Sequence, residues 1–490
     1  SYNSCMNQNF LDVIVVGAGI SGIGAGAHFN TNCPNKSYLI FEGRENFGGT
    51  WDLFKYPGIR SDSDMHTLGF SFKPWNHRKS IATGPLIMDY LKETIDEYNL
   101  DEKIKYSHHV ESANWDESEC LWEVKVLNKK TSEKFIYKSK FLYMCAGYYR
   151  YSSGHEPDFQ GSNDFNGQIV HPQKWPESLN YEDKRVVVIG SGATAATIVP
   201  EIAKKAKLVT MLQRSPTYYV SRPDEDKVAL FLQKFLPKGF VYKLIRFRNV
   251  YLQQLLFKRV RAFPKKAKKF LIDEVRKELP DFDVDKHFVP NYNPWEQRLC
   301  LVPNSDLFES IKNKSATVVT DHIEKFEENG VRVKSGELIE ADIIVTATGL
   351  VLQNFGGIDI SVNNKLVNVS DTMTYKSLMY SDIPNFVNSF GYINASWTLK
   401  ADLTSTFICR LINFMDKNGF NAACPKKPEN VGETFDWLTG YSSGYIQRSL
   451  HLHPKQGDKK PWVNYQDYIR DWIDVKFSKL EDGNLVFSKN

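Results

Sequence analysis

Two glycine-rich turns, each directly after a run of β-branched residues, constrain the fold of this chain more than any other feature. The first, "GAGISG" from Gly17 to Gly22, follows "LDVIVV" and leads into a small-residue helical pattern. In such a unit Gly17 makes the tight turn, Gly19 lets the backbone approach a pyrophosphate, and Gly22 lets the helix pack close to the strand. The helix N-terminus then faces the phosphates. The pattern predicts a dinucleotide-binding Rossmann unit.

An acidic residue ends the next predicted strand. The segment "SYLIFEGR" places Glu42 25 residues after Gly17. A carboxylate at this position can accept hydrogen bonds from ribose hydroxyls while it repels a 2′-phosphate, as binding of FAD or NAD requires.

The same pattern recurs in the middle of the chain, where it carries a different charge. In "KRVVVIGSGATAATIVPEIA", Gly190, Gly192 and Ala195 follow a second β-branched strand. The next strand, "LVTMLQRS", ends in Gln213 and Arg214 instead of an acid. A guanidinium suits a 2′-phosphate, and a charge-assisted contact of about 1.5 to 3 kcal/mol favours NADPH over NADH roughly ten- to a hundredfold. The alternative for Arg214 is a surface arginine at a strand end.

The length of 490 residues predicts two or three domains. Two further strand-like segments, "FLYMCAGYY" and "ADIIVTATGL", resemble the strands at which two-dinucleotide flavoproteins cross between domains. The predicted fold class is α/β, with two Rossmann-like domains for FAD and NADPH and a helical insertion. The predicted segments are 1–150 (FAD-binding, first part), 151–226 (NADP-binding, first part), 227–300 (helical insertion), 301–341 (NADP-binding, return) and 342–490 (FAD-binding, second part, and C-terminal region).

The stretch "GGTWDLFKYPG" carries no redox disulfide. In flavin disulfide reductases a similar stretch holds two cysteines against the flavin, whereas this chain has Trp51 and Tyr56 there. Reduced flavin therefore lacks an obvious dithiol acceptor. The remaining acceptors are dioxygen, a small molecule or a partner protein.

Two long fingerprints resemble those of Baeyer-Villiger monooxygenases, a group of class B flavoprotein monooxygenases. "GGTWDLFKYPGIRSD" matches the pattern [A/G]-G-x-W-x4-[F/Y]-P-[G/M]-x3-D in full. "FNGQIVHPQKWP" matches F-x-G-x3-H-x3-W-P, with Phe165, Gly167, His171 and Trp175 at fixed positions. With both glycine motifs, the resemblance covers nearly the whole chain.

The resemblance implies that NADPH reduces FAD and that dioxygen then forms a C4a-peroxyflavin while NADP⁺ stays bound. One oxygen is inserted next to a ketone carbonyl to give an ester or lactone, and sulfides and thioamides are oxidised at the same site. The substrates are then dioxygen and a small ketone or sulfide. A peroxyanion needs a nearby cation and protection from bulk water.

The resemblance assigns catalytic roles to Arg298, in "PWEQRLC", and to Asp62, which orients the arginine. The alternatives are a structural ion pair for Arg298 and a turn-capping carboxylate for Asp62, because "SDSD" is good turn chemistry. Many relatives carry a lysine directly before the arginine, whereas this chain has Gln297. The preference for NADPH then depends more on Arg214.

Other positions complete the expected site, which contains no metal. His171 is expected to act as a hinge or hydrogen-bonding residue in an interdomain linker, with a direct chemical role as the alternative. Trp397 either lines the substrate pocket or the nicotinamide face, or is a core aromatic. The expected FAD contacts are Gly17, Gly19, Ser21, Gly22, Glu42, Thr50, Trp51 and Val110, and the expected NADP⁺ contacts are Arg60, Gly190, Ser191, Gly192, Ala195, Gln213 and Arg214.

The segment 227–272 is strongly basic. It holds 13 Lys or Arg and no Asp or Glu, and subtracting these charges from the net +4 leaves −9 on the rest of the chain. Leu244, Phe247, Tyr251 and Leu255 recur at helical spacing before Pro264. Such an amphipathic helix can mediate peripheral membrane association or self-association, or pack on the NADPH domain. Nucleic-acid binding is disfavoured because no binding module accompanies the charge.

The seven cysteines are scattered without metal-ligand or C-x-x-C spacing, which is typical of a reduced protein. No signal-like N-terminus or long apolar run is present, so the expected location is cytoplasmic, with a peripheral position at the inner face of the membrane as the alternative.

Three functions compete with Baeyer-Villiger oxygenation. A flavin monooxygenase limited to N- or S-oxygenation shares both Rossmann units but usually has a shorter linker fingerprint. A reductase passes its electrons to a partner. A membrane-surface flavoprotein with a binding role shows negligible NADPH turnover.

Overall fold

The β-branched run before the first glycine turn forms strand β1 (Phe10–Val16), which lies inside the larger of two principal sheets. The computed structural model describes residues 9–430 and 432–490. β1 pairs in parallel with β2 (Tyr38–Phe41) and β6 (Lys134–Met144), as a Rossmann unit requires. The prediction of a strand before each glycine turn is therefore confirmed for the first unit.

The larger sheet combines parallel strands with an antiparallel meander. Its strand order is β18-β17-β4-β5-β6-β1-β2-β3, and β21 pairs with β6 beside this path. The other strands of this sheet are β3 (Ile104–Lys105), β4 (His108–Asp116), β5 (Leu121–Asn128), β17 (Asp359–Val362), β18 (Lys365–Leu366) and β21 (Phe386–Asn388).

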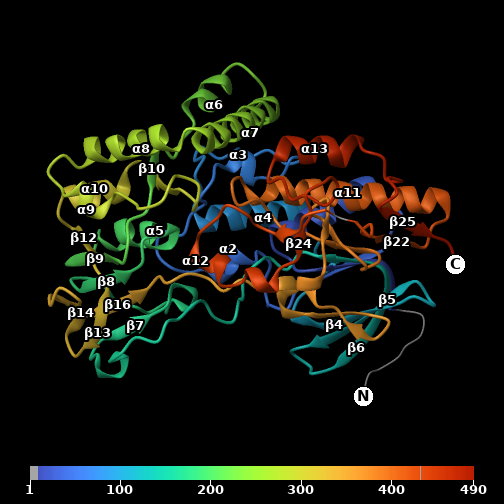
Figure 1. The fold of residues 1–490 in the computed structure, drawn as a ribbon, viewed down its shortest axis with the longest axis horizontal. Helices are drawn as coiled ribbons and strands as arrows, with labels where there is room; N and C mark the ends of the chain where they lie inside the picture. Colours follow the sequence, from blue (N-terminus) through green and yellow to red (C-terminus); the bar gives the residue numbers. More distant parts are fainter. Residues whose placement is uncertain (1–8, 431) are drawn as a thin grey trace.

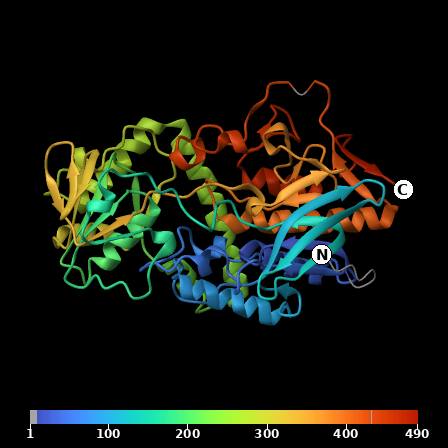
Figure 2. The same cartoon turned by 90° about the horizontal axis from the view of Figure 1, so that it is seen from below.

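Helices from both ends of the chain cover this sheet. α1 (Ile20–Asn32) packs against α11 (Trp397–Asn418), and α4 (Gly84–Glu97) also packs on α1. Their buried residues form one hydrophobic core with β1 and β2. Figure 2 shows these segments, far apart in sequence, gathered in the same half of the molecule. This first domain is therefore built from discontinuous parts of the chain.

The second domain is a parallel α/β unit. Its sheet has the order β12-β9-β8-β16-β7, with α5 (Ala193–Ile202) directly after the second glycine turn. The strands are β7 (Gln168–Val170), β8 (Arg185–Ile189), β9 (Leu208–Gln213), β12 (Ala316–Thr320) and β16 (Ile343–Thr346). An antiparallel sheet of β13 (Ile323–Glu327), β14 (Gly330–Val333) and β15 (Leu338–Glu340) adjoins it. The predicted α/β class with two Rossmann-like domains is confirmed.

The chain crosses between the two domains in two adjacent segments (Figures 1 and 2). The Arg150 amide donates to the Val351 carbonyl at 2.7 Å, and the His155 amide donates to Gly349 at 3.0 Å. β16 still pairs with β7 and β8, so the crossing follows Thr346, a few residues later than the expected boundary at 341.

The basic segment forms the expected helical insertion. α7 (Lys238–Ala262) ends before Pro264, where α8 (Pro264–Glu278) begins, because proline is tolerated in a first turn but not in a helix interior. The insertion also contains α6 (Lys227–Leu232) and α9 (Val284–His287). α8 packs on the second domain, whereas α7 packs on the first domain through α3 (Met65–Leu68). The strands directly before and after the insertion, β10 (Tyr219–Arg222) and β11 (Cys300–Pro303), pair in parallel at its base.

Short elements complete the described chain. They are the helices α2 (Thr50–Leu53), α10 (Asp306–Lys312), α12 (Gly444–Gln447) and α13 (Tyr468–Phe477), the strands β19 (Thr374–Tyr375), β20 (Met379–Tyr380), β22 (Ala422–Pro425), β23 (Phe435–Asp436), β24 (Lys455–Gln456) and β25 (Leu485–Ser488), and the 3-10 turns η1 (Ser162–Asp164), η2 (Pro172–Lys174), η3 (Asn354–Gly357), η4 (Val369–Asp371) and η5 (Leu450–Leu452). Across 9–430 and 432–490, none of the helices has both the length and the apolar character needed to cross a membrane.

Candidate active site

A cavity of about 470 Å³ lies where the two domains meet. The first glycine turn, the stretch after Gly48 and the first turns of α5 all contribute to its wall. The expected site residues on this wall are Gly17, Gly19, Ser21, Glu42, Thr50, Trp51, Arg60, Asp62, Val110, Arg298 and Trp397. The cavity thus brings together residues of the first glycine turn, the first fingerprint and the segment around Arg298.

The first glycine turn has no room for side chains at two positions. Gly17 has φ +108°, and a Cβ there would overlap the Cys145 carbonyl. A Cβ at Gly22 would overlap the carbonyl of Gly17, so the helix could not pack as closely. Gly19 precedes the first turn of α1 and leaves its backbone facing the cavity. This open cradle at a helix N-terminus fits a pyrophosphate.

Glu42 lies at the end of β2 with both carboxylate oxygens engaged. Oε1 accepts from the Ala18 amide and Oε2 from the Arg44 amide, each at 3.1 Å. Burial raises the pKa of the Glu42 carboxyl. The amide of His108 donates to the Glu42 carbonyl, and this contact places Val110, further along β4, near the same end of the cavity. The arrangement fits a ribose and an adjoining base.

The second glycine turn is tight on one side and open on the other. Gly190 has φ +130°, and a Cβ there would overlap the Ala347 carbonyl. A Cβ at Gly192 would meet no atom within 4 Å. The hydroxyl of Ser191 hydrogen-bonds to Thr217 at 2.7 Å, and Ala195 is buried in the second core. The backbone before α5 is therefore accessible to a ligand.

Arg214 and Gln213 point in different directions at the end of β9. Arg214 is exposed beside the second glycine turn, and no ion pair to it is found within 9–430 and 432–490. The Gln213 side chain is buried, and its Nε2 donates to the His287 carbonyl and to Thr320. Arg214 is thus free to contact a phosphate, whereas the amide of Gln213 holds α9 in place.

Arg298 and Asp62 form an ion pair in the cavity wall. Nη2 of Arg298 lies 3.4 Å from Oδ2 of Asp62. The carboxylate raises the pKa of the Arg298 guanidinium, so the arginine remains charged. The side chain of Arg298 is about one-third exposed, and its remaining donors can face the cavity. The resemblance predicts this pair, and the structure places the two groups side by side.

Arg60 connects the first fingerprint to the second domain. Its Nη1 donates to Oδ2 of Asp306 at 2.5 Å. Its Nη2 is buried, and within 9–430 and 432–490 it has no hydrogen-bond partner. This donor is available for an acceptor inside the cavity.

Trp51 and Tyr56 occupy the two positions where disulfide reductases carry cysteines, and both line the cavity. Tyr56 is almost fully buried, and burial raises the pKa of its phenol to about 12. The hydroxyl of Thr50 accepts a hydrogen bond from Tyr149 at 2.6 Å. This part of the wall offers aromatic surface instead of thiols.

Trp397 belongs to the site as well as to the core. Its indole Nε1 donates to Ser21 Oγ at 2.8 Å, and its ring stacks on Tyr148 at 5.1 Å between centroids. Trp397 lines the cavity and also packs against the core of the first domain, and its contact with a substrate stays a prediction.

The second fingerprint lies on the crossing segments. Gln173 Nε2 donates to the carbonyls of Arg150 and Tyr151, and a Cβ on Gly154 would overlap the His171 ring. Burial lowers the pKa of His171. Phe165 is buried in a core of the second domain, Trp175 packs on another, and a Cβ on Gly167 would overlap the Asp342 carbonyl. These residues position the linker and do not line the cavity.

Sequence reasoning missed an aromatic group directly after β6. Tyr148, Tyr149 and Tyr151 all line the cavity, and the rings of Tyr149 and Tyr151 stack at 5.0 Å. Tyr445, from the C-terminal region, joins the same wall. The run "GYYRY" after a crossing strand was the only signal, and aromatic residues alone do not distinguish a site from a core.

The residues present fit two dinucleotides. The first glycine turn and Glu42 would hold FAD through its pyrophosphate and ribose, and the open turn before α5 with Arg214 would hold NADP⁺. The overlaps at Gly17, Gly22 and Gly190 show that both turns depend on glycine.

Family models match most of the chain. The model described as flavin-binding monooxygenase-like matches residues 76–385, and an NAD(P)-binding Rossmann-like model matches residues 15–82.

Full-length relatives are similar over nearly their entire length. FAD-containing monooxygenase EthA of Mycobacterium tuberculosis is 49% identical over 481 residues, which cover 98% of each chain. A probable FAD-binding monooxygenase, AlmA, of Acinetobacter baylyi is 45% identical over 483 residues, covering 98% of this chain and 97% of that one.

Solved structures share the fold. An oxidized steroid monooxygenase bound to NADP gives a TM-score of 0.76 at 23% identity, covering 98% of this chain and all of the other. Cyclohexanone monooxygenase from Rhodococcus sp. Phi1 bound to NADP⁺ gives 0.71 at 23% identity, covering 86% and 87%.

Proposed function

The chain belongs to the flavin-binding monooxygenase-like family, and from this premise we propose that it uses FAD, NADPH and dioxygen to insert one oxygen next to a ketone carbonyl, giving an ester or lactone. The Arg298–Asp62 pair in the wall of the interdomain cavity carries the proposal. Bound FAD would supply electron transfer from the nicotinamide and the activation of dioxygen.

The charge of Arg298 is the main contribution of this chain to the chemistry. Negative charge develops on oxygen as it is inserted beside a carbonyl, and a fixed cation in a cavity shielded from water stabilises that charge. The Asp62 carboxylate stabilises the charge of Arg298, and the ion pair restricts the orientation of the guanidinium. Asp62 thus acts as a positioning residue through the arginine.

Aromatic residues shape the space beside this cation. Trp51, Tyr148 and Trp397 line the cavity, with Trp397 held by its hydrogen bond to Ser21. Such a wall accepts an apolar substrate and excludes water. It also explains why Trp51 and Tyr56 stand where reductases carry a disulfide, since dioxygen is the proposed electron acceptor.

The test is the consumption of NADPH and O₂ by the FAD-loaded protein, with linear and aryl ketones present or absent, and mass spectrometry of the products formed in ¹⁸O₂. An ester that carries one ¹⁸O atom is expected. Sulfoxides from sulfides without any ester from ketones would restrict the protein to heteroatom oxygenation. Rapid electron transfer to an added acceptor without an oxygenated product would instead support a reductase.

A further inference from the structure

Helix α7 is apolar on two opposite faces. Its inner face, with Tyr242, Ile245 and Val250, is buried against the first domain. Its outer face carries Phe240, Leu244, Phe247, Tyr251 and Leu255 at spacings of four, three, four and four residues, which align on one stripe of a helix. These side chains are 42–71% exposed. Packing on the second domain, the alternative for the basic segment, holds for α8 but not for this stripe of α7.

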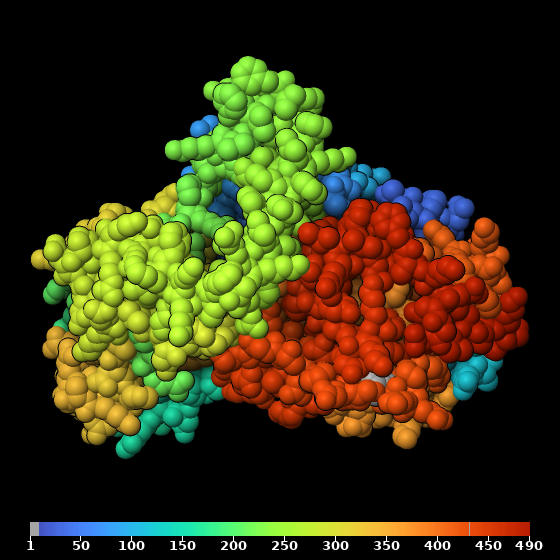
Figure 3. Space-filling view, turned by 45° about the horizontal axis from the view of Figure 1, so that its top comes forward, coloured from blue at the N-terminus to red at the C-terminus, as the bar shows by residue number. Residues whose placement is uncertain are grey.

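The exposed stripe continues onto α6 and the loop that joins it to α7. Val228, Phe231, Phe235 and Leu236 are all exposed, and Phe235 reaches 73%. Figure 3 shows this region standing out from the rest of the surface as a ridge. Soluble proteins seldom expose a contiguous apolar patch of this kind without a partner for it.

α13 adds a second apolar stripe at the same edge of the molecule. Ile469, Trp472, Ile473 and Phe477 are exposed at helical spacing. Figure 1 shows α6, α7 and α13 along the upper edge. An ion pair between Lys258 and the α13 cap joins the two helices. The ridge and α13 can therefore face one common surface.

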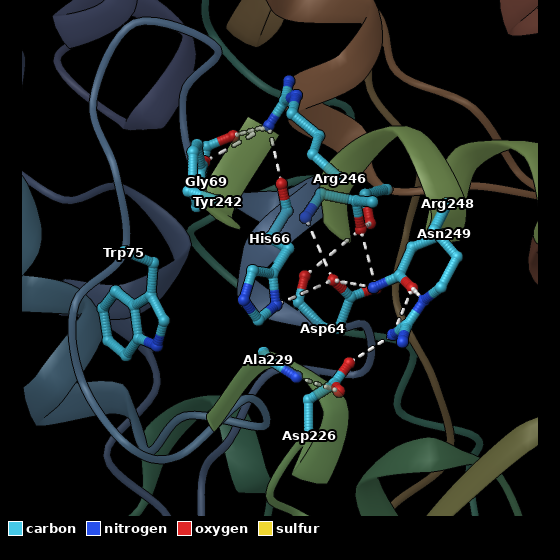
Figure 4. Close-up of polar contacts among 12 residues, drawn as sticks. Asp64, His66, Gly69, Trp75, Asp226, Ala229, Tyr242, Arg246, Arg248 and Asn249 are labelled. Atoms are coloured by element: carbon cyan, nitrogen blue, oxygen red, sulfur yellow. Dashed lines mark hydrogen bonds and ion pairs between the residues drawn. The ribbon is translucent and has the colours of Figure 1, made fainter. Parts of the chain in front are cut away.

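Buried polar contacts hold the ridge in place. Arg246 donates to the carbonyls of His66 and Gly69 and pairs with Asp402, and Arg248 pairs with Asp226, the N-cap of α6. Figure 4 shows Arg246 beside His66 and Gly69, and Arg248 beside Asp226. These contacts fix α7 and the start of α6 against the first domain.

Positive charge borders the apolar stripe. Lys227, Lys234, Lys238 and Lys243 are exposed, and no ion pair to them is found within 9–430 and 432–490. The absence of Asp and Glu from 227–272 leaves these charges unbalanced. A second copy docking through the same face would bring like charges together. Anionic lipid headgroups above an acyl layer match both the charge and the apolar side chains.

We propose that α6, the outer face of α7 and the exposed face of α13 form a docking surface for a bilayer that contains anionic phospholipid. Phe231, Phe235 and Phe247 enter the boundary between headgroups and acyl chains, and the lysines contact the lipid phosphates. We call this surface, which comprises the ridge of α6 and α7 together with α13, the docking surface. The inference goes beyond the proposed oxygenation and does not depend on it.

The first test is co-sedimentation of the full-length, FAD-loaded protein with vesicles. Phosphatidylcholine vesicles with about a third phosphatidylglycerol are compared with pure phosphatidylcholine at ~0.05 M and ~0.5 M salt. Binding is expected only to the anionic vesicles, and it weakens at high salt. No sedimentation with anionic vesicles at low salt would overturn the proposal.

Matched variants locate the surface. Replacement of three ridge aromatics is expected to weaken partitioning at least about tenfold, since apolar burial contributes to interfacial binding. The variant is Phe231→Ser/Phe235→Ser/Phe247→Ser. Its control replaces exposed apolar residues on β1, β7 and β18, namely Phe10→Ser/Ile169→Ser/Leu366→Ser. Equal loss in both triple variants would contradict a local docking surface.

The contribution of positive charge is tested with two triple variants that lower the net charge of the protein by the same amount. Replacing three ridge lysines is expected to lower the partition coefficient on the order of a hundredfold, from about 1 kcal/mol per lysine. The variant is Lys234→Gln/Lys238→Gln/Lys243→Gln, and the control on other elements is Lys130→Gln/Lys334→Gln/Lys365→Gln.

Two further outcomes would reject the proposal, the first for its partner and the second for its surface. Light scattering that shows a dimer lost in the aromatic variant, without vesicle binding by the wild type, would assign the ridge to a second copy. Unchanged vesicle binding in both ridge variants would place the membrane contact elsewhere. NADPH oxidation with a water-soluble substrate checks that the variants remain folded, because the replaced residues lie outside the cavity wall.

Discussion

The neighbours of Arg298 determine the electrostatic environment of its guanidinium. The Asp62 carboxylate at 3.4 Å raises the pKa of the guanidinium, and Tyr148 and Tyr445 line the same cavity wall. None of these neighbours is visible in "PWEQRLC" alone.

Replacing this arginine separates the two half-reactions. In Arg298→Ala, the reduction of FAD by NADPH is expected to persist, whereas ester formation falls on the order of a hundred- to a thousandfold, as for other preorganised charge donors. Stopped-flow flavin reduction and product analysis measure the two steps. The control is Arg276→Ala, which removes an exposed arginine paired with Asp285. Unchanged ester yield in Arg298→Ala would remove Arg298 from the mechanism.

Arg214 is expected to determine the choice of nicotinamide cofactor. Its charge is exposed beside the second glycine turn, where a 2′-phosphate would lie. Arg214→Ala should lower kcat/KM for NADPH roughly ten- to a hundredfold and leave that for NADH nearly unchanged. Steady-state kinetics with both cofactors checks this, with Arg222→Ala, at the end of β10, as the control. An equal loss for both cofactors would indicate a structural role.

His453 is expected to make stability depend on pH. The ring is buried beside Trp437, burial lowers its pKa to about 4, and within 9–430 and 432–490 its Nε2 has no hydrogen-bond partner. The unfolded chain takes up a proton near pH 6.5, whereas the folded chain resists it, so stability falls as pH drops from about 6.5 towards 4.

Urea unfolding at two pH values measures this effect. Between about pH 7.5 and 5 the wild type should lose roughly 2 kcal/mol more than His453→Phe, which keeps an aromatic ring but cannot titrate. Equal losses in both proteins would show that His453 is not responsible.

Sequence alone predicts the role of a residue best at positions that only one type of amino acid can occupy. Gly17 and Gly190 were predictable because positive φ and close carbonyls exclude a side chain there. Gln213 shows the limit, since spacing placed it near the cofactor while its amide turns inward to His287. Tyr148 was missed because an aromatic residue carries no comparable constraint.

At the scale of elements, α7 was predictable as a helix but not in its orientation. The spacing of apolar residues predicted a helix over 244–255, and Pro264 predicted where it ends. Because apolar residues occupy both faces, periodicity could not decide which face is buried. Arg246 resolves this, since its contacts with His66 (Figure 4) and with Asp402 turn one face inward.

Loss of Arg246 should weaken the docking of α7 on the first domain. Asp402 is buried and its pKa is lowered although burial opposes this, because His28 and Arg246 stabilise the carboxylate. Arg246→Leu leaves this charge partly uncompensated, at a cost of about 3 to 5 kcal/mol. The stabilisation by Asp402 is present above its unfolded pKa near 4 and is lost as pH falls through its lower folded value.

Limited proteolysis and thermal unfolding test this expectation. Arg246→Leu should become sensitive to cleavage near α7, whereas Lys243→Leu, on the exposed face, should behave like the wild type. Comparable protease resistance and melting temperature in both variants would contradict the anchoring role of Arg246.

At the scale of the whole molecule, the cavity exists because two domains meet along paired crossing segments. The discontinuous first domain and the late crossing after Thr346 follow from pairing between distant strands. The sequence indicated two Rossmann units, but only the pairing registers determine how the first glycine turn and the start of α5 come to line one cavity. The crossing segments also hold the second fingerprint, through Gln173 and the contact between His171 and Gly154.

The crossing segments should therefore couple cofactor oxidation to oxygen insertion. In Gly154→Ala, the new methyl group would overlap the His171 ring and approach the Gly349 carbonyl to 3.0 Å, so the two segments must separate. Both cofactor turns remain intact, and NADPH oxidation should continue, while a larger share of the reduced oxygen should appear as hydrogen peroxide. The ratio of ester to peroxide measures this coupling. Gly239→Ala is the matched control, since a Cβ there meets only Pro74 at 3.9 Å. A wild-type ratio in Gly154→Ala would show that the relative position of the two domains does not depend on this contact.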